Sequence, residues 1–117
     1  MLSENEWQET FQKDLVYLIE NDTDVIGSLS CEKKGDTHVY ISGLVIKPSF
    51  QNKGFGKQIL VYLLEELKNI QRIDLVTHPD NHVALTLYKS LGFTVESRKE
   101  NYYGDGEPRF VLSLIRI

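Results

Sequence analysis

The sequence predicts an α/β fold, a mixed twisted sheet with helices on its faces, in the order short N-terminal segment, then β-β-β-α-β-α-β-β. Three observations predict it. Before Lys47 the chain is a series of stretches rich in β-branched and aromatic residues, separated by turn-forming residues. The pattern then changes to that of an amphipathic helix, and a short apolar run follows the helix. A helix between two strands of one sheet implies a parallel crossover, so the sheet is expected to be mixed.

The first half of the chain is expected to be an antiparallel meander. Residues 14–20 and 25–33 are β-rich, and the turn-forming residues 21–24 between them predict a hairpin. A second turn at 34–36 leads into a longer strand over 37–46. Gly43 inside this strand is typical either of a bulge, which would splay the sheet, or of a merely weakened strand.

The second half is expected to continue from a helix over Lys57 to Ile70. Its apolar stripe has helical spacing and consists of Ile59, Leu60, Leu63, Leu67 and Ile70. A buried strand over 73–77 follows. A second helix is expected to begin at Asn81, whose side chain caps free amides, and to close at Gly92.

Phe93 is expected to fold back onto Tyr88 or Leu87, directly after the second helix. Residues 94–100 and 109–117 then predict two final strands, joined across the hairpin-type turn at Asp105-Gly106.

Composition limits the classes of function. With 117 residues, of which 41% are hydrophobic and 26% charged, the chain is expected to be one globular domain over residues 1–117. The net charge of −4 without a basic run argues against nucleic acid as a partner. Cys31 is the only cysteine, which excludes an internal disulfide and favours a reducing compartment. No stretch reaches the roughly 18 apolar residues of a membrane span. A cytoplasmic protein with no membrane partner is therefore expected.

A glycine-containing loop between the third strand and the first helix has the chemistry of a phosphate site. Unpaired backbone N–H groups and the helix dipole attract anions at such a place, and glycine lets the backbone approach them closely. The loop consists of Gln51, Asn52, Lys53, Gly54, Phe55, Gly56 and Lys57. The alternative is a tight turn that needs glycine for geometry alone. Spacing excludes a Walker loop, since Gln58 replaces its hydroxyl residue, and a dinucleotide fingerprint, since Ile59 occupies its third glycine position.

The stretch Leu44 to Lys57 resembles the acetyl-CoA signature of GNAT acetyltransferases, whose core is [QR]-x-x-G-x-[GA]. A second block, Asn81 to Phe93, resembles the family's N-x-x-A-x-x-x-Y-x-x-x-G-F. Both blocks have the order and separation found in the family. The resemblance implies acetyl-CoA as co-substrate without a metal, and transfer of acetyl to a primary amine of a small molecule or peptide by direct attack in a ternary complex.

The resemblance also implies roles for individual residues. In similar proteins the pantetheine arm lies beside the third strand, at Leu44, Val45 and Ile46, where Leu44 and Ile46 offer backbone hydrogen bonds. Tyr88 matches the tyrosine that can protonate the departing thiolate. Asn81 matches a cofactor contact, although it is equally well explained as a helix cap, and both roles can hold together.

The catalytic base is ambiguous in this sequence. The third strand carries His38, Tyr40 and Ser42 on one alternating face and no carboxylate, so a water-relayed base at His38 or Tyr40 is the hypothesis. The loop Tyr102 to Glu107 falls where the family often places acceptor-facing residues, but it is also an ordinary hairpin loop.

The cluster His78, Asp80 and His82 could suggest a metal. Pro79 breaks helical register between the histidines, and a polar loop explains all three, so no metal site is expected.

The chain departs from the family at its start. GNAT proteins usually place a strand and two helices before the first hairpin, where this chain has about 13 residues before Asp14, enough for one short helix or strand. The acceptor site is therefore expected to be open, completed by a second subunit, or absent. Trp7 and Phe11, on a short helix, could cover the sheet of the chain or of a homodimer partner. The alternative to an enzyme is a non-catalytic acyl-CoA-binding module or sensor.

Overall fold

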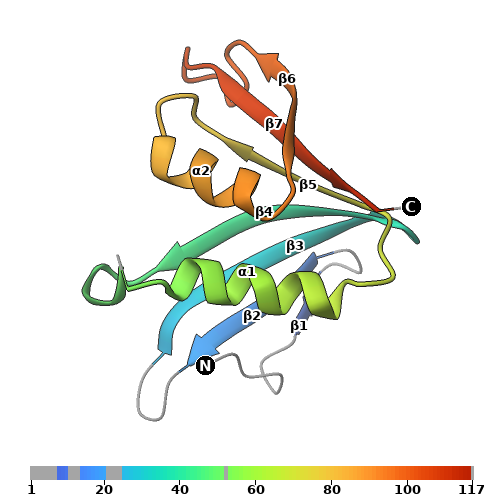
Figure 1. Ribbon diagram of the computed structural model, residues 1–117, viewed down its shortest axis with the longest axis vertical. Helices are drawn as coiled ribbons and strands as arrows, with labels where there is room; N and C mark the ends of the chain where they lie inside the picture. Colours follow the sequence, from blue (N-terminus) through green and yellow to red (C-terminus); the bar gives the residue numbers. More distant parts are fainter. Residues whose placement is uncertain (1–7, 11–13, 21–24, 52, 117) are drawn as a thin grey trace.

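A single sheet organises the molecule. The computed structural model describes residues 8–10, 14–20, 25–51 and 53–116 (Figure 1). The described strands form a seven-stranded sheet in the order β1-β2-β3-β4-β5-β7-β6. The strands are β1 (Gln8–Thr10), β2 (Asp14–Glu20), β3 (Val25–Gly35), β4 (His38–Ile46), β5 (Arg72–Thr77), β6 (Thr94–Lys99) and β7 (Arg109–Ile115). The described helices are α1 (Phe55–Glu66), α2 (His82–Ser90) and the short 3-10 helix η2 (Pro48–Phe50).

The predicted meander and crossover are confirmed. β2, β3 and β4 pair antiparallel in sequence order, and β4 pairs parallel with β5 after the chain passes through α1. The sheet is therefore mixed, as the helix between two strands implied.

The sequence did not predict two of the pairings. β1 adds a short antiparallel strand beside β2, at residues that were expected to hold either a short helix or a strand. β7 lies between β5 and β6 and is antiparallel to both. A final hairpin can add to a sheet through either of its strands, and alternation of apolar residues alone does not distinguish the two.

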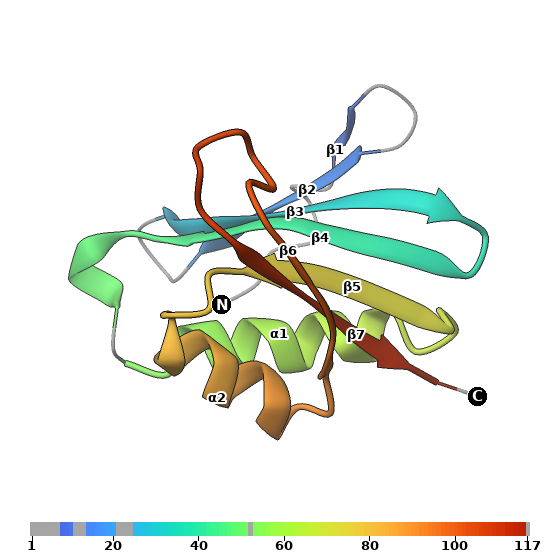
Figure 2. The same ribbon diagram turned by 90° about the horizontal axis from the view of Figure 1, so that it is seen from above.

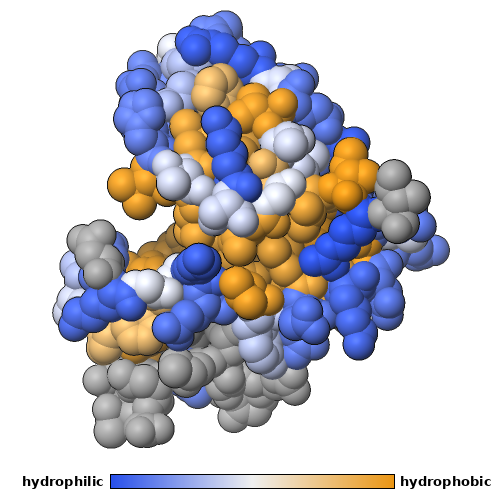
Figure 3. Space-filling model, in the orientation of Figure 1, coloured by the Kyte–Doolittle hydropathy of each residue, from blue (hydrophilic) through white to orange (hydrophobic). Residues whose placement is uncertain are grey.

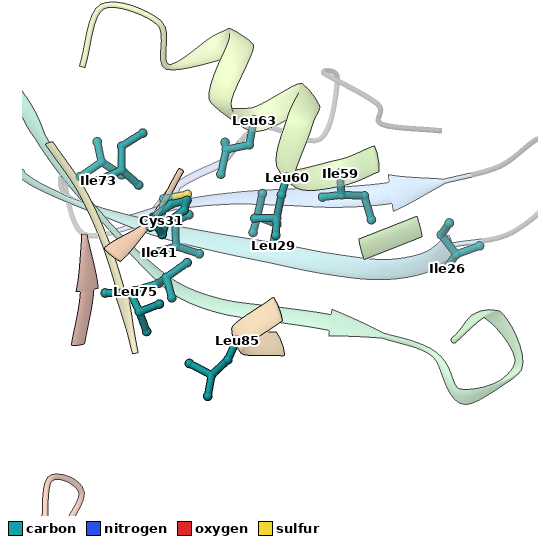
Figure 4. Close-up of a cluster of buried hydrophobic side chains, with 13 residues drawn as sticks. Ile26, Leu29, Cys31, Ile41, Ile59, Leu60, Leu63, Ile73, Leu75 and Leu85 are labelled. Atoms are coloured by element: carbon teal, nitrogen blue, oxygen red, sulfur yellow. The ribbon is translucent and has the colours of Figure 1, made fainter. Parts of the chain in front are cut away.

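Both helices cover the same face of the sheet, as the view from above shows (Figure 2). They bury one continuous core against the strands, in which Ile59, Leu60 and Leu63 of α1 are at most 3% exposed (Figure 4). Leu85 of α2 belongs to the same core. Cys31 is buried there too, and burial raises the pKa of its thiol to about 12. A thiol that stays protonated at neutral pH has no nucleophilic role.

α1 is shorter than the predicted stripe at its C-terminal end. Leu67 and Ile70 still pack against the core, but from a turn that follows the last helical residue, Glu66. Arg116 closes this end, because its guanidinium donates to the carbonyl oxygens of Leu67 and Leu64, both at 2.8 Å. These bonds satisfy helical carbonyls that lack a partner in the helix and place a cation at the negative end of its dipole.

α2 begins and ends as predicted. The Asn81 side chain accepts a hydrogen bond from the Ala84 amide at 3.1 Å, and Gly92 has φ 101° just after the helix. Phe93 folds back so that its ring centre lies 6.2 Å from that of Tyr88.

Two expectations near the N-terminus lie outside the described residues, namely those for Trp7 and Phe11. Among the described residues, no helix has the length and apolar character needed to cross a membrane.

Candidate active site

β4 and β5 separate along part of their length, and this separation creates the site. They pair only where residues 38–40 meet residues 72–74, and beyond Tyr40 the two strands diverge (Figure 1). A bulge accompanies the divergence: Cys31 of β3 pairs with Ile41, whereas the preceding Ser30 pairs with Gly43. One extra residue on β4 bends that strand, so of the two expectations for Gly43, a bulge or a merely weakened strand, the structure has the bulge.

A hollow lies in the gap between the diverging strands. Residues 40–44 of β4 form one wall, Leu75 and Val76 of β5 form another, and Tyr88 of α2 and Tyr103 of the β6–β7 loop complete it. The space-filling view shows a notch at the same place and apolar side chains across the middle of the helical face (Figure 3). Its walls combine the backbone of residues 40–44, a few apolar side chains and two tyrosines, and such a mixed lining suits a small acyl group or amine better than a large charged ligand.

The open edge of β4 offers backbone hydrogen-bonding groups. The Lys47 amide donates to the Ile26 carbonyl of β3 at 2.8 Å. Because the backbone N–H and C=O groups of successive strand residues point to opposite sides, this bond fixes the direction of those groups along the end of β4. By this alternation the backbone groups of Val45 point toward β3, while the amides and carbonyls of Leu44 and Ile46 point into the gap. The Ile46 carbonyl already accepts from Gln51 Nε2 at 2.9 Å. Any contact from Val45 would come from its side chain, which is 62% exposed.

The loop before α1 leads into the helix through a glycine. Gly54 is the residue before the helix and has φ 82°, a conformation that a side chain disfavours. Among the described residues no side chain caps this helix, and its first turn contains no acidic residue. Lys53 and Lys57 are both exposed. The N-terminus of α1 is therefore an uncapped positive end with cations beside it, while Asn52 lies outside the described residues.

Tyr88 brings a hydroxyl to the hollow. Its ring is half-buried beside Phe93, and this burial raises the pKa of the hydroxyl above its usual value. A raised pKa keeps the proton on the oxygen through neutral and moderately alkaline pH, as a general acid requires.

His38 is part of a network of charged groups on the face of the sheet opposite the helices. Its Nε2 lies 2.6 Å from Oδ2 of Asp74, which lies two residues along β5 from Arg72, the register partner of His38. Asp74 also accepts hydrogen bonds from Ser113 at 2.6 Å and from Arg72 at 3.0 Å. Arg72 in turn donates to Glu96 at 2.6 Å. The imidazole is thus held by a carboxylate that is itself fixed from two sides.

Comparison with known families decides the classification. Residues 2–93 match the model of the acetyltransferase (GNAT) family. The chain belongs to the GNAT family. This is the family that the two sequence blocks resemble, and its members are acyltransferases.

Curated relatives of this GNAT chain are N-acetyltransferases. The ribosomal protein bS18-alanine N-acetyltransferase of Salmonella typhimurium is 34% identical over 62 residues, which are 51% of this chain and 42% of the relative. The L-amino acid N-acetyltransferase AaaT of Escherichia coli is 29% identical over 111 residues, covering 86% of this chain and 67% of the relative. The chain therefore matches less than half the length of the first relative.

Solved GNAT structures share the fold. The ribosomal-protein-S18-alanine N-acetyltransferase of Escherichia coli has a TM-score of 0.82 at 22% identity, covering 91% of this chain and 71% of that one. A GNAT family acetyltransferase from Elizabethkingia anophelis with acetyl-CoA bound has a TM-score of 0.82 at 19% identity, covering 90% of this chain and 78% of that one. A Bacillus subtilis acetyltransferase in complex with CoA has a TM-score of 0.81 at 21% identity, covering 92% and 80%.

The sequence did not predict that Asp74 contacts His38. The third strand has no carboxylate, whereas Asp74 comes from the neighbouring β5. The alternation in Arg72-Ile73-Asp74-Leu75 put Asp74 on the face opposite the core, but the register of a parallel pair is set by the crossover and cannot be read from either strand.

The polar loop before α2 shows no metal cluster. His78 bonds Glu107 through Nε2 at 2.9 Å, and its Nδ1 accepts from the Asp80 amide at 3.0 Å. Among the described residues no group of three or more His, Cys, Asp or Glu side chains could hold a metal ion.

The β6–β7 loop of this GNAT chain reaches the hollow through its tyrosines. Tyr103 lines the gap beside Tyr40, and Tyr102 packs edge-on against Tyr103 with ring centres 4.8 Å apart. Burial and the neighbouring hydroxyls of Tyr103 and Tyr102 raise the pKa of Tyr40 far above its usual value. Tyr40 therefore keeps its proton at neutral pH.

Proposed function

We propose that the protein is an N-acetyltransferase that transfers acetyl from acetyl-CoA to a primary amine of a small molecule or peptide, by direct attack in a ternary complex. One observation carries the proposal: the hollow between β4 and β5 meets an open backbone edge and a half-buried tyrosine in a chain of the GNAT family. Those are the groups that hold an extended amide-containing ligand and protonate a leaving thiolate.

The cofactor contacts follow from the free groups around this hollow. Leu44 and Ile46 would bind the amides of the pantetheine arm along the open edge of β4. The diphosphate would lie against the uncapped amides of residues 54–57, with Gln51, Lys53 and Lys57 around it. A Cβ on Gly56 would meet nothing within 4 Å, so the first turn of α1 leaves room for a ligand.

The remaining proposed contacts come from β4, the loop and α2. Val45 would contribute its exposed side chain, Asn52 and Phe55 would border the diphosphate, and Asn81 would touch the cofactor while capping α2. Asn52 is proposed from its place in the sequence motif alone.

Bound acetyl-CoA supplies the acetyl group as a thioester, and the chain supplies orientation and proton handling. Tyr88 holds a proton at its hydroxyl for the leaving sulfur. The acceptor ammonium must lose a proton before it attacks, so a base is needed. Of the two residues proposed for it, Tyr40 keeps its own proton because its pKa is raised, which favours His38 acting through water.

The acceptor class is proposed from chemistry and from the relatives' names. The two curated relatives are named for an alanine of a ribosomal protein and for L-amino acids. Both substrates present a primary amine next to a carbonyl group. A primary amine on a small molecule or at a peptide end is therefore the acceptor to test first, and a homodimer remains a further proposal.

The test is a thiol-release assay with acetyl-CoA and a panel of amino acids, peptides and polyamines. Amine-dependent CoA release is expected, and Gly54→Glu is expected to abolish it and acetyl-CoA binding, because a carboxylate would enter the phosphate loop. Gly106→Glu is the matched control, since Gly106 has φ 80° and, like Gly54, open space at its Cβ position. It adds the same charge in the same backbone conformation, and acetyl-CoA affinity should persist.

A second candidate function is a non-catalytic acyl-CoA-binding module. The observation in its favour is that β4, from His38 to Ile46, carries no carboxylate to act as a base. Saturable acetyl-CoA binding in calorimetry, with no CoA release over the whole amine panel, would establish this function in place of the enzyme.

A further inference from the structure

The His38–Asp74 pair has a defined proton arrangement. An ionised carboxylate accepts hydrogen bonds and does not donate them. Burial opposes ionisation of Asp74, but the bonds from Ser113 and His38 and the charge of Arg72 outweigh it and hold its pKa below the usual value. The proton of the 2.6 Å contact therefore lies on His38 Nε2, and in the neutral imidazole Nδ1 keeps a free lone pair.

Asp74 has little freedom to turn away from the imidazole. Its side chain is only 14% exposed, and Oδ1 accepts from Ser113 and Arg72, while Oδ2 faces His38 and accepts a longer bond from Arg72 at 3.3 Å. Arg72 is anchored in turn by two contacts to Glu96, at 2.6 and 2.8 Å. A carboxylate fixed on one oxygen and facing an imidazole with the other orients the ring and selects its tautomer.

The pair also opens onto the proposed reaction site. His38 is 35% exposed and, with Asp74, lines a hollow on the helix-free face that also includes Lys34 and Tyr102. Tyr40 and Val76 line both this hollow and the one that contains Tyr88. The two hollows therefore share a wall. An ion pair that only stabilised the fold would not need to lie beside the proposed reaction site.

We propose, resting on the proposed function, that Asp74 is a positioning residue that holds His38 in the Nε2–H tautomer, so that His38 Nδ1 accepts the proton of the acceptor ammonium. The N–H bond of the ammonium breaks, the amine keeps the electron pair, and an N–H bond forms at Nδ1, directly or across one water. The imidazolium then releases a proton to solvent, which restores the tautomer. The carboxylate that is missing from β4 is thus supplied from β5 and acts through an imidazole.

The kinetic test uses Asp74→Asn and His38→Gln in the full chain. Each is expected to lower kcat for the amine about 10²-fold, which is the size of a lost general-base contribution. Acetyl-CoA affinity in calorimetry should stay unchanged. The double variant should be no slower than His38→Gln, because residues that act as one unit are not additive. Glu100→Gln is the control, since it removes a carboxylate from the exposed Arg98 pair at 2.7 Å. A wild-type kcat in Asp74→Asn, or a further loss in the double variant, overturns the proposal.

A spectroscopic test separates this inference from the proposed function. The ¹⁵N chemical shifts of the His38 ring, measured in the wild-type protein at a pH where it is neutral, report which nitrogen carries the proton. We expect protonated Nε2 and unprotonated Nδ1, and a mixture of tautomers in Asp74→Asn. An Nδ1–H tautomer in the wild type overturns the inference whether or not turnover is observed. If the expected shifts are found but no amine-dependent turnover is seen, the result counts against the proposed function. The proton transfer to His38 is then overturned as well, and Asp74 only orients the imidazole.

Discussion

Tyr88 is held by packing on one side and faces the hollow on the other, so its ring and its hydroxyl can be tested separately. Tyr88→Phe keeps the ring against Phe93 and removes only the hydroxyl. We expect kcat to fall about 10²-fold, with acetyl-CoA affinity nearly unchanged, because a positioned acid contributes about that factor. Steady-state kinetics and calorimetry on the same preparations measure the two effects. Unchanged kcat would reduce Tyr88 to a core aromatic.

The raised pKa of Tyr88 sets the direction of a pH dependence. A general acid must be protonated, and burial moves the loss of its proton to a pH above the ordinary value of 10.0. Activity that depends on Tyr88 should therefore persist through pH 9 and decline only above the usual tyrosine range. A rate profile of the chemical step between pH 6 and 11 tests this. A decline of Tyr88-dependent activity below pH 9 would show that the hydroxyl is not shielded.

Asn81 has two proposed roles that different substitutions separate. Asn81→Asp retains an oxygen that can cap the Ala84 amide, so stability should change little. Asn81→Ala removes the cap and should lower the free energy of unfolding by about 1 kcal/mol. If Asn81 also contacts acetyl-CoA, both variants should weaken its binding, and calorimetry beside chemical denaturation distinguishes the cases. Wild-type affinity in both leaves Asn81 as a cap alone.

At the scale of the elements, the position of β4 depends on how closely β3 approaches it. A Cβ on the buried Gly27 of β3 would overlap the carbonyl oxygen of Val45, which is backbone and cannot turn aside. Gly27→Ala should therefore lower the free energy of unfolding by about 2 kcal/mol, the usual range for overpacking. Gly35→Ala is the matched control, because a Cβ there meets nothing within 4 Å. Equal denaturation midpoints for the two variants would contradict the close approach.

The elements that could be predicted from the sequence are those whose signals are local. The hairpins follow from turn residues and alternation, α1 from its apolar stripe, and the cap of α2 from Asn81 and Gly92. Gly43 indicated either a bulge or a weakened strand, and the structure decides for the bulge. Each of these depends on residues that lie within a few positions of one another.

The parts that could not be predicted depend on contacts between distant segments. The pairing of His38 with Asp74 requires the parallel register across α1, and the contact of Ser113 with Asp74 requires β7 to lie beside β5. Arg116 closes α1 from the far end of the chain. Neither register nor strand order has a local signal, so the candidate base could be named from the sequence while its carboxylate partner could not.

At the scale of the whole molecule, the proposed cofactor site joins two halves of one sheet. The half from β1 to β4 and the half from β5 to β7 share only three register pairs, at residues 38–40 with 72–74. The proposed contacts come from β4 and the N-terminus of α1 on one side and from α2 on the other. A ligand that engages all of them should stabilise the domain as a unit, beyond stiffening one loop.

Acetyl-CoA at about 100 times its Kd should therefore stabilise the fold by about 2.7 kcal/mol, a rise of the order of 10 °C in Tm for a domain of this size. Hydrogen exchange should show added protection in β4 and in α2 together, because both halves gain contacts. Gly54→Glu should lose the thermal shift and the protection alike, which ties both to the phosphate loop. Protection confined to the residues around Gly54 would mean that the ligand is held by the loop alone and does not span the gap between β4 and β5.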